Sequence, residues 1–138
     1  MDVIGAFNNH LPVKVRFGEG IAKTLPDVIK EVEGKHVFLM VDDGIEKFNP
    51  AAASLIDLLN SNGTFKVTHF GKPAGEPTIA MVDDATNALT KSGADVVVAL
   101  GGGSVIDTAK AARLCSQLGV SFREFSAAAP TYPAPKIP

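Results

Sequence analysis

One stretch decides the fold: ADVVVALGGGSVIDTAK, residues 94–110. Its first part, residues 95–100, is an almost continuous apolar run, which is typical of a strand buried on both faces of a parallel sheet. Three glycines follow at once, and a helical pattern then runs from Ser104 to about Leu118. The stretch therefore predicts a buried strand, a tight glycine turn and a helix, in that order.

The same alternation recurs towards the N-terminus. Strands are predicted at residues 13–17, 36–41 and 65–70, and each is followed by apolar residues at helical spacing. Four strand–helix units of this kind predict an α/β fold with a parallel sheet and helices on both of its faces. Residues 1–125 are expected to form this domain, and residues 126–138 a proline-rich tail.

Composition excludes several classes of function. The chain has 138 residues and a formal net charge of −2, so a basic surface for nucleic acid is not expected. No apolar run approaches the roughly 18 residues that a membrane span needs, and no secretory leader is visible. The single cysteine, Cys115, cannot form an internal disulfide and fits a reducing, cytoplasmic location.

The glycine turn is suited to hold an anion. Ligands of open parallel sheets bind at the carboxyl ends of the strands, and glycines let backbone N–H groups approach a phosphate closely. The free N–H groups and partial positive charge of the helix start favour a diphosphate there. The alternative is a plain tight turn, in which Ser104 and Asp107 stand at capping-box spacing and stabilise the helix start.

A second candidate for the site is Asp42, which ends the strand predicted at residues 36–41. A carboxylate there could accept hydrogen bonds from a ribose diol and would repel a 2′-phosphate. An ordinary Asp-Asp-Gly turn explains the same residues, and Asp43 could take the role instead. The glycines match neither the standard dinucleotide fingerprint nor the Walker spacing, because Ile106 stands where the former has its last glycine.

The histidines, the cysteine and two of the phenylalanines are expected to have structural roles. His10, His36 and His69 are scattered, which argues against a metal site. Cys115 lies within an apolar helical pattern and is expected to be a buried thiol. Aromatic side chains are expected to fill the core or line a pocket: Phe17 and Phe70.

Residues 101–110, with the pattern Gly-Gly-Gly-Ser-x-x-Asp-x-x-Lys, resemble the iron-containing (group III) alcohol dehydrogenase family. Further landmarks of that family stand in the same order: Phe17-Gly18-x-Gly20, Val41-Asp42, Glu76-Pro77-Thr78 and the strand that leads into the glycines. The resemblance implies a Rossmann-like nucleotide-binding domain of the dehydroquinate-synthase type. It also implies hydride transfer between a small alcohol or aldehyde and NAD, with Fe²⁺ or Zn²⁺ held by a separate helical domain.

The resemblance also implies roles for individual residues. Four of them would cradle the pyrophosphate: Gly101, Gly102, Gly103 and Ser104. Asp107 would lie towards the nicotinamide, and Asp42 would hold the adenosine ribose and favour NAD over NADP. Glu76 belongs to a loop that flanks the nucleotide in relatives.

The resemblance stops before the parts that complete the enzyme. The Pro-Thr-Thr segment and the metal ligands of the family, an Asp and three His, would follow Pro138, and none of the three histidines here matches a ligand position. The chain is therefore expected to be the nucleotide-binding half of a dehydrogenase, inactive alone, and to form a homodimer or a higher oligomer. The alternatives are a stand-alone nucleotide-binding module without catalysis and a glycerol-dehydrogenase-like relative.

Overall fold

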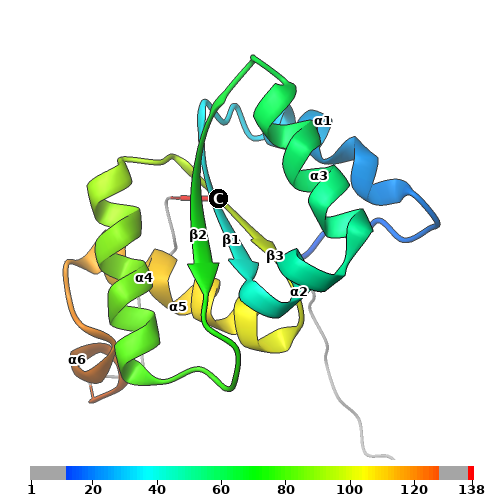
Figure 1. Cartoon of the computed structure of the whole chain (residues 1–138). Helices are drawn as coiled ribbons and strands as arrows, with labels where there is room; N and C mark the ends of the chain where they lie inside the picture. The colour runs from blue at the N-terminus through cyan, green and yellow to red at the C-terminus, as the bar shows by residue number, and fades with distance from the viewer. Residues whose placement is uncertain (1–11, 128–136) are drawn as a thin grey trace, which may run out of the picture.

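The computed structural model of the chain describes residues 12–127 and 137–138. Ten elements follow one another along it: η1(Ile21–Thr24), α1(Leu25–Glu31), β1(His36–Asp42), α2(Asp43–Phe48), α3(Pro50–Ser61), β2(Lys66–Lys72), α4(Ile79–Ser92), β3(Val96–Leu100), α5(Gly103–Leu118) and α6(Phe122–Ala127). The strands form one parallel sheet in the order β2-β1-β3 (Figure 1). The predicted α/β fold class is therefore confirmed.

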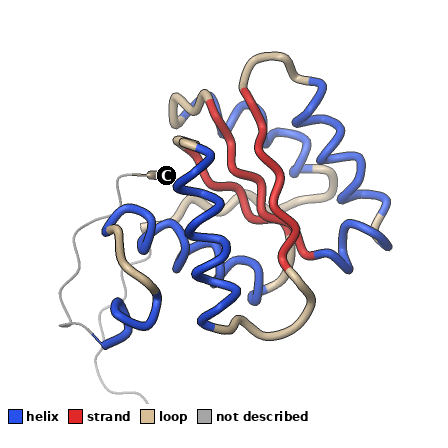
Figure 2. Tube along the Cα trace, turned by 60° about the vertical axis from the view of Figure 1, so that its left-hand side comes forward, coloured by secondary structure: helices blue, strands red, loops and turns tan. Residues whose placement is uncertain are grey.

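Helices cover both faces of this sheet, as Figure 2 shows. Successive side chains of β1 point to opposite faces, so Phe38 and Met40 join one core cluster while Val37 and Leu39 join the other. On the first face they meet residues of α4 and α5, and on the second they meet residues of α1 and α3. Because β1 is central and covered on both sides, its five inner residues are buried, as its apolar run predicts.

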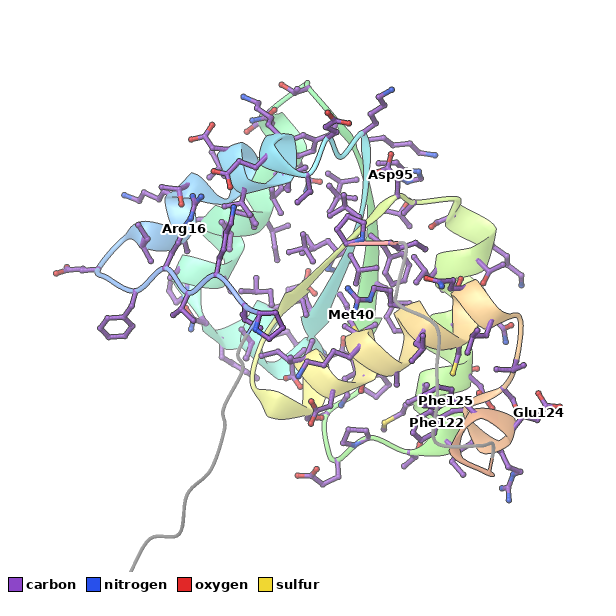
Figure 3. The ribbon with its side chains drawn as sticks, turned by 180° about the vertical axis from the view of Figure 1, so that it is seen from behind. Arg16, Met40, Asp95, Phe122, Glu124 and Phe125 are labelled. Atoms are coloured by element: carbon purple, nitrogen blue, oxygen red, sulfur yellow. The ribbon has the colours of Figure 1, made fainter. Side chains whose placement is uncertain are left out.

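The strand predicted at residues 13–17 is wrong, because this segment has no strand partner in the described part of the chain. Its side chains are open to solvent, and Phe17 is 99% exposed, so it fills neither the core nor a pocket. The segment is held to α1 by an ion pair, Arg16 Nη2 to Glu31 Oε1 at 2.5 Å (Figure 3). Alternation alone cannot make a strand without a neighbour to hydrogen-bond with.

Near the C-terminal end, helix α6 and residue Pro138 both contact the body of the fold. Phe122 and Phe125 of α6 stack on each other, with ring centroids 6.0 Å apart, and α6 packs against α4 and α5 (Figure 3). The Val97 amide, on the outer edge of β3, donates to the Pro138 carbonyl at 3.0 Å. The predicted tail of residues 126–138 lies mostly outside the described residues, as does His10, and its boundary stays a prediction.

Asp95 joins the amino ends of β1 and β3 (Figure 3). Its carboxylate accepts hydrogen bonds from the Lys35 amide at 3.0 Å and the His36 amide at 2.9 Å. Partial burial raises the pKa of this carboxyl, but the backbone donors of His36 and Lys35 together outweigh burial and leave the pKa below its usual value. A carboxyl with a lowered folded pKa stabilises the fold above its unfolded pKa of about 4 and ceases to do so as pH falls through the folded pKa.

Asp95→Asn is therefore expected to lower the free energy of unfolding at pH 7 by up to about 1 kcal/mol, because the exposed amide accepts more weakly than a carboxylate. The difference from the wild type should shrink below about pH 4, where the native carboxylate also becomes protonated. Urea unfolding at several pH values measures this, with the exposed Asp27→Asn as control. A gap that is the same at pH 7 and pH 2 would contradict the expectation.

Candidate nucleotide-binding site

Three strand ends meet at the carboxyl edge of the sheet. Asp42, the last residue of β1, pairs in register with Lys72, the last residue of β2. On the other side of β1, Val41 pairs with Leu100, so the turn at Gly101 begins next to Asp42 (Figure 1). This is the edge at which open parallel sheets bind ligands.

The three glycines of the turn differ in whether the packing of the fold requires them. A Cβ on Gly101 would stand 2.7 Å from Val105 Cγ2 and 3.6 Å from Asp42 Cβ, so the fold itself requires glycine there. Among the residues that the structure describes, a Cβ on Gly102 or Gly103 would meet nothing within 4 Å beyond its chain neighbours and local helix backbone, and neither residue has a positive φ. The protein's own packing gives no reason for glycine at these two positions, and their missing side chains leave open space in front of α5.

The start of α5 is the anion-binding end of this space. Gly102 is its N-cap, and no side chain of the described residues caps it. The predicted capping box of Ser104 and Asp107 is therefore wrong, because the helix begins one residue earlier than Ser104. Val105 and Ile106 both donate to the Gly102 carbonyl, at 3.1 and 3.2 Å, while the N–H groups before them precede the first helical bond. A helix of 16 residues with such a start favours a negative charge.

Ser104 is turned towards the loop that follows β2. Its hydroxyl donates to the Gly75 carbonyl at 2.6 Å, across 29 residues of sequence. Asp107 lies one turn further along α5, is exposed, and pairs with Lys110 at 3.4 Å. Glu76 is also exposed in this loop, and Thr78 caps α4 by accepting from the Met81 amide at 3.2 Å.

Asp42 caps the start of α2, in addition to any role in the site. Its Oδ1 accepts from the Gly44 amide at 2.9 Å and the Ile45 amide at 3.3 Å, and it thereby begins α2. The segment for which an ordinary turn was the alternative is thus a short capped helix. Among the described residues no donor is bonded to Oδ2, so one oxygen of this half-buried carboxylate stays available beside the glycine turn. The Asp43 side chain instead lies against Gly71 of β2. A Cβ on Gly71 would stand 2.5 Å from Asp43 Oδ1.

The structure adds Lys72 to the site. Its side chain is fully buried, and its ammonium donates to the carbonyls of Pro73 at 2.8 Å and Gly75 at 2.7 Å. Gly75 therefore accepts from both Lys72 and Ser104. No motif signals Lys72, because a lysine at the end of a strand usually reaches solvent; only the contacts of the folded chain reveal it.

The histidines and the cysteine have structural surroundings. His36 shares a hydrogen bond of 2.8 Å with Thr68, and His69 lies 3.4 Å from Glu46. Cys115 is fully buried, as predicted, and burial followed by the nearby Asp83 charge raises the pKa of its thiol. Within residues 12–127 and 137–138, no group of three His, Cys, Asp or Glu could hold a metal ion.

Comparison with known sequences assigns the family. The sequence profile described as "Iron-containing alcohol dehydrogenase" matches residues 12–138, which is most of the chain. The chain belongs to the iron-containing alcohol dehydrogenase family. Its described residues do not fit the metal of that name, since they bring no ligand set together.

Two curated relatives illustrate how far the similarity extends. A mitochondrial hydroxyacid-oxoacid transhydrogenase of Xenopus tropicalis is 32% identical over 112 residues, covering 80% of this chain and 24% of the relative. The long-chain primary alcohol dehydrogenase AdhA of Thermoanaerobacter ethanolicus is 34% identical over 97 residues, covering 68% of this chain and 24% of the relative. The chain thus spans about a quarter of the length of these relatives.

Solved structures of two enzymes resemble this chain in fold. Sulfoacetaldehyde reductase of Bifidobacterium kashiwanohense, determined in complex with NAD⁺, matches with a TM-score of 0.82 and 25% identity, covering 97% of this chain and 35% of that one. NADH-dependent butanol dehydrogenase A of Thermotoga maritima matches with a TM-score of 0.78 and 25% identity, covering 86% of this chain and 30% of that one.

In the part of the chain that the structure describes, no helix is long and apolar enough to cross a membrane.

Proposed function

We propose that this chain is the nucleotide-binding part of an NAD-dependent, metal-dependent alcohol dehydrogenase. The observation that carries the proposal is the open space at Gly102 and Gly103 in front of an uncapped helix start, next to Asp42. A diphosphate there would accept hydrogen bonds from the first N–H groups of α5 and meet the positive end of its dipole. The free oxygen of Asp42 would accept from a ribose hydroxyl.

The chain's own contribution would be to bind and orient the nucleotide. NAD, when bound, supplies the acceptor for a hydride removed from an alcohol carbon. Asp107, one turn into α5 from the turn, is the residue that we place towards the nicotinamide. Because the described residues offer no metal ligand set, we propose that this chain alone does not oxidise alcohols.

Calorimetric titration of the 138-residue chain with NAD tests the binding half of this proposal. We expect saturable binding of one NAD per chain and no NADH formation from ethanol or butanol. Adding a separately produced helical metal domain of a family member should then restore alcohol-dependent NADH absorbance at 340 nm. The absence of NAD binding would overturn the proposal, whereas binding without any restored activity would favour a stand-alone nucleotide-binding module.

A second candidate for the substrate is a hydroxyacid. Its basis is the sequence match to relatives described as hydroxyacid-oxoacid transhydrogenases, which are 32–35% identical to this chain. The two candidates share the nucleotide site and differ in the residues that surround the substrate. In the restored assembly, a hydroxyacid and a primary alcohol of equal chain length, compared by kcat/KM, distinguish them.

We also propose that the chain self-associates through residues 12–17. The segment exposes Val13 (67%), Val15 (81%) and Phe17 (99%), and its backbone could pair with a second copy. Sedimentation velocity should show a dimer that Val15→Asp shifts to a monomer, while Val32→Asp, at the C-cap of α1, leaves it a dimer. A wild-type monomer at high concentration would contradict this.

A cytoplasmic location, which the single buried cysteine favours, is likewise a proposal. Several relatives are described as mitochondrial, so the two compartments are the ones to compare. Fractionation of cells that carry the natural gene measures it directly.

A further inference from the structure

Lys72 is an unusual lysine. Its side chain is completely buried at the carboxyl end of β2, and within the described residues no carboxylate lies at ion-pair distance. Buried ammonium groups are costly unless they are hydrogen-bonded, and this one is bonded to two backbone carbonyls, those of Pro73 and Gly75. The fold therefore keeps a positive charge under the loop of residues 73–78 rather than at the surface.

The Gly75 carbonyl connects this charge to the glycine turn. It accepts from Lys72 Nζ at 2.7 Å and from Ser104 Oγ at 2.6 Å. A carbonyl oxygen has two lone pairs, so both bonds can form at once. One backbone atom thereby joins the end of β2, the loop and the first turn of α5.

Ser104 and Lys72 differ in the number of hydrogen bonds that each can donate. A serine hydroxyl has a single proton, so Ser104 can donate either to Gly75 or to a phosphate oxygen at a given moment. An ammonium group has three donors, and Lys72 is held in place by burial. If Ser104 turns to a phosphate, the Gly75 carbonyl keeps its bond to Lys72 and is not left unpaired.

We propose that Lys72 is a positioning residue for diphosphate binding: it holds the Gly75 carbonyl so that the Ser104 hydroxyl is free to donate to the nucleotide's phosphate. The inference rests on the proposed nucleotide function of the glycine turn. Without Lys72, Ser104 is the only partner of the Gly75 carbonyl that remains among the described residues, so the hydroxyl must give up this bond whenever it donates to a phosphate. The charge of Lys72, close to the start of α5, adds to the attraction for an anion.

A double-mutant cycle tests this directly, with NAD and ADP as ligands in calorimetric titrations of the full 138-residue chain. Lys72→Met keeps the length of the side chain and removes its donors, and Ser104→Ala removes the hydroxyl. In the wild type, Ser104→Ala should weaken binding of both ligands about tenfold, the size of a hydrogen bond to a charged group. In the Lys72→Met background the same change should weaken binding less than about twofold, because the hydroxyl is already retained by Gly75.

Lys66→Met is the matched control, since Lys66 is an exposed lysine of the same strand and its loss changes the net charge equally. Circular dichroism checks folding, and Lys72→Leu, which also lacks donors, replaces Lys72→Met if the latter does not fold. Additive effects of the two changes, or equal binding by the Lys72 and Lys66 variants, would overturn the inference and leave the proposed function standing. A wild-type chain that binds neither ligand would overturn both.

Discussion

Gly103→Val is expected to weaken NAD binding by at least about tenfold, or about 1.4 kcal/mol, while leaving the fold intact. Apart from its chain neighbours and the backbone of α5, a Cβ at this position meets no atom of the described residues within 4 Å, and the residue has no positive φ, so the fold tolerates valine. The side chain would instead occupy the open space in front of α5. Because it blocks the approach of a phosphate to the first N–H groups of the helix, the loss should appear in affinity rather than in stability.

Titration with NAD and thermal unfolding of the same samples separate the two effects. Ala53→Val is the matched control, since Ala53 is an exposed residue in the first turn of α3, a helix that is not part of the glycine turn. Both variants should unfold within a few degrees of the wild type, and only Gly103→Val should lose affinity. Equal NAD affinity in the wild type and Gly103→Val would show that the nucleotide does not lie against the turn.

The residues whose role is local to a strand end could be predicted from sequence. β1, β2 and β3 each lie within two residues of their predicted bounds. For β1 and β3 the reason is a continuous apolar run closed by aspartate or glycine, which is typical of a strand inside a parallel sheet. Asn49 and Pro50 begin α3 as their types suggest, and the Asn49 side chain accepts from the Ala51 amide at 3.0 Å. The predictions succeeded where neighbouring residues in sequence are also neighbours in space.

The features that depend on contacts between segments far apart in the sequence could not be predicted from it. The alternation at residues 13–17 looks like a strand, but pairing is a property of two segments, and the described chain supplies only one. Ser104 has the type and spacing of a capping residue, yet its hydroxyl goes to Gly75, 29 residues earlier. Lys72 joins the site only through the same carbonyl. Neither contact leaves a signal in the local sequence.

Asp42→Asn is expected to shift the preference between NAD and NADP at least about tenfold towards NADP. The free oxygen of Asp42 beside the turn is negative, so it favours a ribose diol and repels a 2′-phosphate, and the amide removes that repulsion. Asparagine caps helices about as well as aspartate, and its Oδ1 can still accept from the Gly44 and Ile45 amides. The variant should therefore keep α2 and change only specificity, whereas Asp42→Gly would disturb both.

The ratio of dissociation constants for NADP and NAD, measured by titration, reports this shift directly. Asp43→Asn is the matched control, because it removes the same charge one residue away, where the side chain lies against Gly71 rather than the glycine turn. If Asp43→Asn shifts the ratio and Asp42→Asn does not, the acidic residue of the site is Asp43 and Asp42 serves only as the cap of α2. A ratio unchanged in both variants would mean that neither carboxylate meets the ribose, and that the charge at the end of β1 has no part in choosing the nucleotide.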